Sequence, residues 1–289
     1  MKRAFRRFVG KLTGRNKYIF FIVLLLVCIV ALSLGIYGQF FYKYSATDPL
    51  MIGINIGAEK TAEEYAILES NFNDLFNNSL RVNSEDFTID KLQEDQDVVY
   101  TAYDLVNEDE TFYNVDAKIP LINIDSEAVS KINNEIKNEY YNKANSIMRQ
   151  TEGNTNYKVT YEAFINSDYL SLVIKSVLKE TDKSEKVTIK TYVYGMSRKE
   201  MVTLEDLIEL KGTTKEAVQI NIDDEIEKAN INAQIIAEEY GTLYERDLNS
   251  EIYNVDESDV YFLTDDGYVY IVYPYGNTSY TNEMDIVIF

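Results

Sequence analysis

Apolar residues form one long uninterrupted run near the start of the chain. Residues 18–38 contain no Asp, Glu, Lys or Arg. A helix of this length rises about 30 Å, which matches the hydrocarbon core of a bilayer. Seven lysines and arginines and no acidic residue lie within residues 1–17, and such a positive flank stays on the cytoplasmic side. The pattern therefore predicts a single-pass membrane protein with a cytoplasmic tail at 1–17, a transmembrane helix at 18–38 and the rest of the chain outside the cell.

A cleaved signal peptide would share the basic start and the apolar run. The run at 18–38 is longer than the apolar part of a usual signal peptide. No small-x-small cleavage site stands at its end, since Ala31 and Ser33 lie inside it. The sequence therefore favours an anchor over a cleaved signal.

Between the membrane segment and residue 98 the pattern is weaker. Apolar residues at helical spacing over Thr61–Leu80 predict a modest amphipathic helix. The stretch Arg81–Asp97 is acidic with only isolated apolar residues, which is typical of a linker. We therefore expect residues 39–97 to be an extracytoplasmic stalk with a short helix, followed by a folded domain at 98–289.

Period-two patterns predict three groups of strands in that domain. The first is a hairpin, the second an antiparallel meander, and the third a hairpin at Asp266-Gly267 followed by a last strand. The predicted strands are 98–106, 111–119, 157–166, 169–178, 186–194, 259–263, 268–273 and 284–289.

Two long helices interrupt these groups. The first carries apolar residues in steps of three and four, at Val129, Ile132, Ile136, Tyr140, Ala144 and Ile147. The capping pair Thr203 and Asp206 begins a short helix at 204–210, and Thr213 with Glu216 is placed to begin the second long one. Runs of strands with only two long packing helices predict an α+β fold with largely antiparallel sheets.

Composition excludes several kinds of chemistry. The chain has no histidine, and its single cysteine, Cys28, lies in the predicted membrane segment. Histidine-based triads, histidine-ligated metals, disulfides and thiol catalysis are therefore ruled out for the outer domain. No catalytic motif, metal site or cofactor site is predicted.

The outer part is strongly acidic. Eight of the 28 Lys and Arg residues lie before residue 45, so the remainder has 20 of them against all 48 acidic residues, a net charge of −28. Such a domain attracts basic proteins and is repelled by nucleic acid and anionic lipid, over about 8 Å at physiological salt.

The stretch from about Val98 to Phe289 resembles the extracytoplasmic domain shared by the peptidoglycan deacetylase PdaC and the anti-sigma factor RsiV of Gram-positive bacteria. The matching segments are Ile119-Pro120, Ile132-Asn133, Tyr169–Val173, Val202–Ile208 and Tyr261–Tyr275. Residues 179–186 replace a Gly-Gly-Ala-His turn of that family. The resemblance implies a fold and a cell-envelope location. The deacetylase activity would need a histidine-containing catalytic domain, and the sigma-factor role a larger cytoplasmic domain than residues 1–17.

Tyrosines near the C-terminus are the candidate ligand-binding residues. Tyr268, Tyr270, Tyr273 and Tyr275 lie on or beside the predicted strand 268–273, where exposed rings could stack on sugars or anchor a protein. The alternative is that these tyrosines fill the buried face of a strand, which tyrosine does well.

Pairs of acidic residues leave an enzyme open as an alternative. Two carboxylates can hydrolyse a glycan, and the acidic clusters are 223–225, 256–259 and 265–266. The sequence predicts first a membrane-anchored binding or sensing module of the cell envelope, whose ligand is a protein, such as a basic lysozyme-like one, or peptidoglycan. The alternative is a cell-envelope glycan hydrolase.

Overall fold

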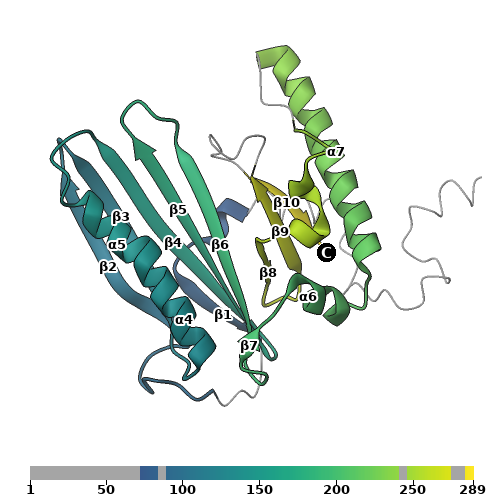
Figure 1. Ribbon diagram of the computed structural model, residues 1–289, viewed down its shortest axis with the longest axis horizontal. Coiled ribbons are helices and arrows are strands. Elements are labelled where there is room, and N and C mark those ends of the chain that lie inside the picture. The colour runs from purple at the N-terminus through teal and green to yellow at the C-terminus, as the bar shows by residue number, and fades with distance from the viewer. Residues whose placement is uncertain (1–71, 84–88, 241–245, 275–283) are drawn as a thin grey trace, which may run out of the picture. The chain divides into compact units, whose positions relative to one another are not determined.

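The computed structural model describes residues 72–83, 89–240, 246–274 and 284–289 (Figure 1). These residues belong to one compact unit, residues 55–289. None of the helices in these ranges is long and apolar enough to cross a bilayer. The predicted tail at 1–17 and transmembrane helix at 18–38 lie outside the described residues.

The larger sheet has seven strands in the order β2-β3-β4-β5-β6-β7, with β1 beside β4. The antiparallel meander β4-β5-β6 confirms the prediction, and β2 with β3 forms the predicted hairpin. The strands are β1 (Ser79–Asn83), β2 (Val99–Asp109), β3 (Tyr113–Ile122), β4 (Thr155–Asn166), β5 (Tyr169–Glu180), β6 (Lys186–Gly195) and β7 (Glu200–Met201).

A helix with one wide turn covers one face of this sheet (Figure 1). It consists of α4 (Glu127–Ile136), a π-helical turn (Lys137–Tyr141) and α5 (Asn142–Ile147). All six apolar positions predicted for this helix are buried. Apolar residues spaced four apart shift gradually around an α-helix, which has 3.6 residues per turn. The π-helical turn has more residues per turn, so it brings these residues back onto one face.

A second, three-stranded sheet packs on the opposite face, and the sequence did not predict a separate sheet. Its order is β10-β9-β8, all antiparallel. Phe262 of β8 stacks on Phe164 of β4 with ring centroids 5.7 Å apart, so the two sheets share an aromatic core. The strands are β8 (Tyr261–Leu263), β9 (Val269–Pro274) and β10 (Met284–Ile288).

Helices α6 (Leu204–Leu210) and α7 (Lys215–Tyr240) lie beside the second sheet (Figure 1). Asn221 of α7 donates to the carbonyl of Ile288 at 3.2 Å. The capping pair Thr203 and Asp206 is confirmed. For α7 the predicted cap was wrong by one residue, because Thr214 accepts from the N–H of Ala217 at 3.2 Å.

The seven-stranded sheet is therefore buried on both faces where the second half of β4 lies beside the first half of β5. Along β5, Leu170, Leu172 and Ile174 face the α4–α5 core, while Phe164 of β4 and Val173 of β5 face the second sheet. This explains why β5 shows a run of buried residues instead of a simple alternation.

The predicted stalk at 39–97 was wrong for the described part of that range. Residues 79–83 form β1, which pairs in parallel with Glu162–Asn166 of β4. The predicted helix 61–80 does not continue to Leu80, because Phe72–Leu75 is a short 3-10 helix and Asn78 has φ 58°. Phe72 is 2% exposed in the core of the second sheet, so the folded domain begins well before residue 98.

A buried carboxylate joins β1 to β4. The side chain of Glu162 is 0% exposed and accepts from Ser79 Oγ, from the N–H of Asn77 at 3.3 Å and from Arg81 Nε at 2.9 Å. Burial raises the pKa of Glu162, although its bonds to Ser79, Asn77 and Arg81 pull the pKa downward. The net shift means that the folded protein holds this proton more tightly than the unfolded chain does.

We predict that Glu162→Gln changes how stability depends on pH. The proton on Glu162 stabilises the folded state below the unfolded pKa, and this contribution is lost as pH rises through the raised folded pKa. Urea unfolding of the wild type and of Glu162→Gln at several pH values from 4 to 8 measures the difference. The wild type should lose stability relative to Glu162→Gln as pH rises, and a difference that is constant with pH would contradict this account.

Candidate functional site

A groove opens between helix α4 and the hairpin that joins β6 to β7. Its volume is about 580 Å³, within the usual range of ligand sites of roughly 300–1,000 Å³. Residues three and four apart on α4 form one wall, β6 forms the floor and the hairpin forms the other wall. The lining residues are Glu127, Ala128, Lys131, Ile132, Glu135, Tyr192, Lys199 and Met201.

A smaller hollow of about 390 Å³ lies along α5 and the residues that follow it. Its lining residues all come from one helical stretch, Tyr141–Arg149. The groove at α4 is the better candidate because three separate elements converge on it.

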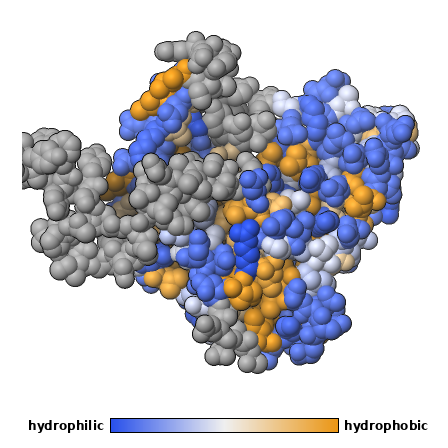
Figure 2. Space-filling view, turned by 180° about the vertical axis from the view of Figure 1, so that it is seen from behind, coloured by the Kyte–Doolittle hydropathy of each residue, from blue (hydrophilic) through white to orange (hydrophobic). Residues whose placement is uncertain are grey.

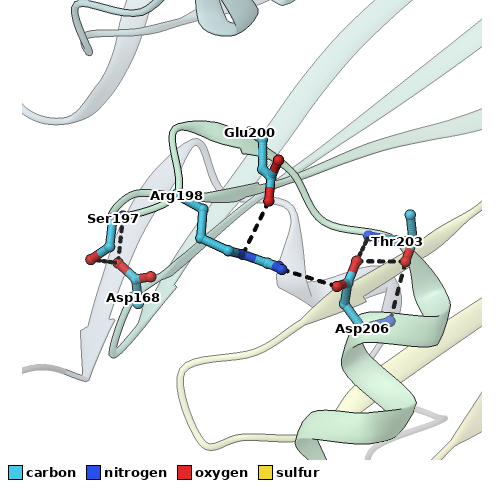
Figure 3. Close-up of polar contacts among 6 residues, drawn as sticks. All are labelled: Asp168, Ser197, Arg198, Glu200, Thr203 and Asp206. Carbon is cyan, nitrogen blue, oxygen red and sulfur yellow. Dashed lines mark hydrogen bonds and ion pairs between the residues drawn. The ribbon is translucent and has the colours of Figure 1, made fainter.

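The hairpin wall is held by polar contacts of two adjacent residues in its turn (Figure 3). The Asp168 carboxylate accepts from both the N–H and the Oγ of Ser197 at 2.7 Å. Arg198 Nη1 lies 3.1 Å from Asp206 Oδ1, and its Nε lies 3.5 Å from Glu200 Oε1. The turn is thereby tied both to the β4–β5 turn and to α6.

Asp206 has two roles in that arrangement. Its carboxylate accepts from the N–H of Thr203 at 2.7 Å, and its own N–H donates to Thr203 Oγ1 at 3.1 Å. Hydrogen bonds to the carboxylate from the hydroxyl and then from the N–H of Thr203 hold the pKa of Asp206 below its ordinary value, with Arg198 adding to the effect. The capping box that begins α6 therefore also positions the hairpin.

Lys199 stands at the tip of the hairpin in a strained backbone conformation. Its φ is 55°, in the left-handed region that few residues other than glycine adopt. Strain of this kind persists where the surrounding structure fixes it, and it is common at binding sites. The contacts of Ser197 and Arg198 on one side, and the pairing of Glu200 with Gly195 on the other, supply that constraint.

The groove is apolar along its middle and carries both signs of charge on its rims. Ala128, Ile132 and Met201 supply the apolar surface, and Met201 is 40% exposed. On the α4 rim Lys131 pairs with Glu127 at 2.7 Å. On the hairpin rim Lys199 Nζ lies 4.0 Å from Asp90. The rims are balanced in charge, so the groove itself does not select strongly for an anion or a cation.

An ion-pair cluster joins α4 to the floor of the groove. Lys190 of β6 contacts Glu135 and lies 2.9 Å from Glu139 Oε2. Burial alone would lower the pKa of Lys190, but its bonds to the two carboxylates outweigh burial and raise it. Lys190 thus binds both glutamates, and these ion pairs help to fix the position of the helix on the sheet.

Four tyrosine hydroxyls are buried beneath the α4–α5 helix without a hydrogen-bond partner among the described residues: Tyr140, Tyr157, Tyr192 and Tyr194. Burial is the main cause that raises the pKa of Tyr140, Tyr157 and Tyr192, in the last case to about 12. Burying an unpaired hydroxyl costs about 1–3 kcal/mol. The hydroxyls of Tyr157 and Tyr194 therefore lower stability where they stand.

We predict that Tyr194→Phe leaves the free energy of unfolding unchanged or raises it by up to about 1 kcal/mol, because it removes a buried hydroxyl and keeps the ring. Chemical denaturation followed by circular dichroism measures the change. A loss of more than about 1 kcal/mol would show that a partner satisfies this hydroxyl.

The tyrosines proposed as ligand contacts lie mostly in the core. Tyr268, Tyr270 and Tyr273 are 8%, 2% and 2% exposed, so their rings have no open face for stacking. Tyr275 lies outside the described residues. The placement of the other three matches the alternative in which tyrosine fills the buried face of a strand, and the groove does not include them.

The acidic clusters do not converge on the groove. Its two glutamates, Glu127 and Glu135, are eight residues apart on α4, which separates their Cα atoms by about 12 Å. The hydrogen bond and charge of Lys131 lower the pKa of Glu127, whereas a catalytic acid needs a raised one. Among the described residues no group of His, Cys, Asp and Glu could hold a metal ion.

Comparison with known proteins gives a structural neighbour of low similarity. No family model matches the chain, and no curated protein matches it. A crystal structure of a DUF3298 family protein from Pseudomonas aeruginosa PAO1 matches with a TM-score of 0.37 and 12% sequence identity. The match covers 61% of this chain and 79% of that one. At this level of similarity it identifies no function for the chain.

Proposed function

We propose that this chain is a membrane-anchored module of the cell envelope, and that its outer domain binds a protein ligand in the groove between α4 and the β6–β7 hairpin. The observation that carries the proposal is the groove itself, with its apolar middle, balanced rims and braced hairpin wall. The anchor is residues 18–38, with residues 1–17 in the cytoplasm and the domain outside. This orientation rests on the sequence pattern.

The character of the groove favours a protein over a wall glycan. Sugar rings are commonly bound by stacking on an exposed aromatic ring. The aromatic residue lining this groove is Tyr192, which is only 7% exposed. An apolar side chain of a protein, flanked by polar groups that meet the charged rims, suits the surface better. The net charge of −28 from residue 45 onward favours a basic partner at long range, and a lysozyme has this character.

A glycan hydrolase remains the second candidate on sequence grounds, because paired carboxylates are present. Inverting and retaining enzymes place the two carboxyl groups roughly 5 to 9.5 Å apart. No observation of the groove favours that geometry. Binding is therefore the function we put forward.

Binding of the full chain in neutral detergent micelles to a lysozyme, and in parallel to insoluble peptidoglycan, tests the proposal. The expected result is saturable binding to the basic protein that persists at physiological salt. Binding to peptidoglycan alone would show that the ligand is a glycan and not a protein. Binding that salt abolishes, or no binding to either, would contradict the proposal, because attraction by net charge alone is screened beyond about 8 Å.

A further inference from the structure

Helix α7 carries apolar residues on two opposite faces. The inner face, with Val218, Ile222 and Ile226, is buried against the second sheet. On the outer face, Ile220, Ile231 and Ile235 are 62%, 48% and 60% exposed. Figure 2 shows apolar surface on the upper part of this helix, bordered by hydrophilic residues.

The three exposed isoleucines lie in one line. Ile231 and Ile235 come 11 and 15 positions after Ile220, so they lie within about 60° of it around a helix of 3.6 residues per turn. Ile220 and Ile235 are separated by about 22 Å along the axis. Isolated exposed apolar residues are ordinary on a protein surface, but three in one line mark a strip along the helix that can serve as a contact surface.

Acidic side chains lie within the same strip. By the same helical geometry Asp224 and Glu227 fall between Ile220 and Ile231 on this face, within about 40° of Ile220, and both are exposed. Glu216 and Asp223 are exposed nearby, while Lys228 of the strip pairs with Glu225 at 2.7 Å. The surface is apolar at its ends and negative in its middle.

We propose that the outer face of α7, defined by Ile220, Asp224, Glu227, Ile231 and Ile235, docks a cationic amphipathic helix of a partner protein. Charge complementarity selects this occupant. An anionic lipid surface and a second copy of this acidic domain would both meet like charge, which opposes contact. A helix with apolar residues on one face and lysine or arginine beside them satisfies both parts of the strip. The proposal is independent of the groove at α4.

The test uses two synthetic peptides of roughly 18 residues in amphipathic helical order, one of leucine and lysine and one of leucine and glutamate. Each is titrated onto the immobilised full chain in neutral detergent micelles, with empty micelles as the blank. A photoreactive group on the apolar face of the lysine peptide records where it binds. The expected result is that only the lysine peptide binds and that it crosslinks to α7.

Paired variants separate this face from the rest of the acidic surface. Ile231→Ser with Ile235→Ser should weaken binding of the lysine peptide at least tenfold, and Asp224→Asn with Glu227→Gln should weaken it and reduce its salt dependence. The controls are Val106→Ser, an apolar residue 73% exposed on β2, and Glu108→Gln with Glu152→Gln, two exposed acids elsewhere. The controls should bind as the wild type does. Equal binding by all variants, or crosslinks outside α7, would overturn the proposal.

Discussion

Replacing Asp285 by alanine is expected to lower the free energy of unfolding by about 3–5 kcal/mol, because it leaves a buried guanidinium without its anion. Arg246 and Asp285 are 4% and 8% exposed in their side chains. The pair is bidentate, with Nε–Oδ2 and Nη2–Oδ1 distances of 2.7 and 2.6 Å. It ties the segment after α7 to β10. Urea unfolding followed by circular dichroism measures the loss.

The double variant Arg246→Met with Asp285→Leu is the matched control. It removes both charges and keeps apolar volume, so it should recover most of the stability lost in Asp285→Ala. Arg246→Lys alone should also lower the free energy of unfolding, because an ammonium cannot make the paired contact of a guanidinium with Asp285. If Asp285→Ala costs less than about 1 kcal/mol, water reaches this pair and its burial is not as the structure has it.

Replacing Phe262 by alanine should cost about 3–5 kcal/mol, the usual loss for a buried phenylalanine. Phe262 is 0% exposed and lies between the two sheets. Its ring centroid is 5.7 Å from that of Phe164 and 4.9 Å from that of Tyr270. The substitution removes the aromatic contact that joins β8 to the seven-stranded sheet. Thermal and urea unfolding of the variant measure the loss.

Two controls make the Phe262 prediction specific. Phe262→Leu keeps most of the volume and should cost about half as much as the alanine variant or less. Val106→Ser, at an exposed position, should change stability by no more than about 0.5 kcal/mol. A small loss in Phe262→Ala would mean that the second sheet does not depend on this core.

The local elements of the fold could be predicted from the sequence because their patterns are local. The apolar steps from Val129 to Ile147 predicted the buried face of the α4–α5 helix, and Thr203 with Asp206 predicted the start of α6. The three strands of the meander followed from alternation and short polar turns. Each of these signals is complete within about 20 residues.

Other features depend on contacts between distant residues. Ser79 pairs with Glu162, 83 positions later, and the short stretch 79–83 has no pattern that predicts a strand of this sheet. The tyrosines on and beside β9 were candidates for an exposed row of rings. Alternation predicts a strand, but it does not show which face of the strand is covered by another layer of the fold. The groove draws on α4, β6 and the hairpin at 196–201, so no single motif contains it. Part of the groove could have been predicted from Lys199 and Met201. These residues lie just before the capping box at Thr203, which the sequence already identified as the start of a helix.

The most direct test of the proposed function is to block the groove while leaving the rest of α4 unchanged. Ala128→Trp places an indole in the groove, and Ser130→Trp places the same ring on an exposed position of the same helix that does not line it. Binding of a lysozyme to the full chain in detergent micelles is measured for both at physiological salt. We expect Ala128→Trp to lose binding at least tenfold while Ser130→Trp binds as the wild type does. Equal binding by the two variants would contradict the assignment of the groove as the ligand site.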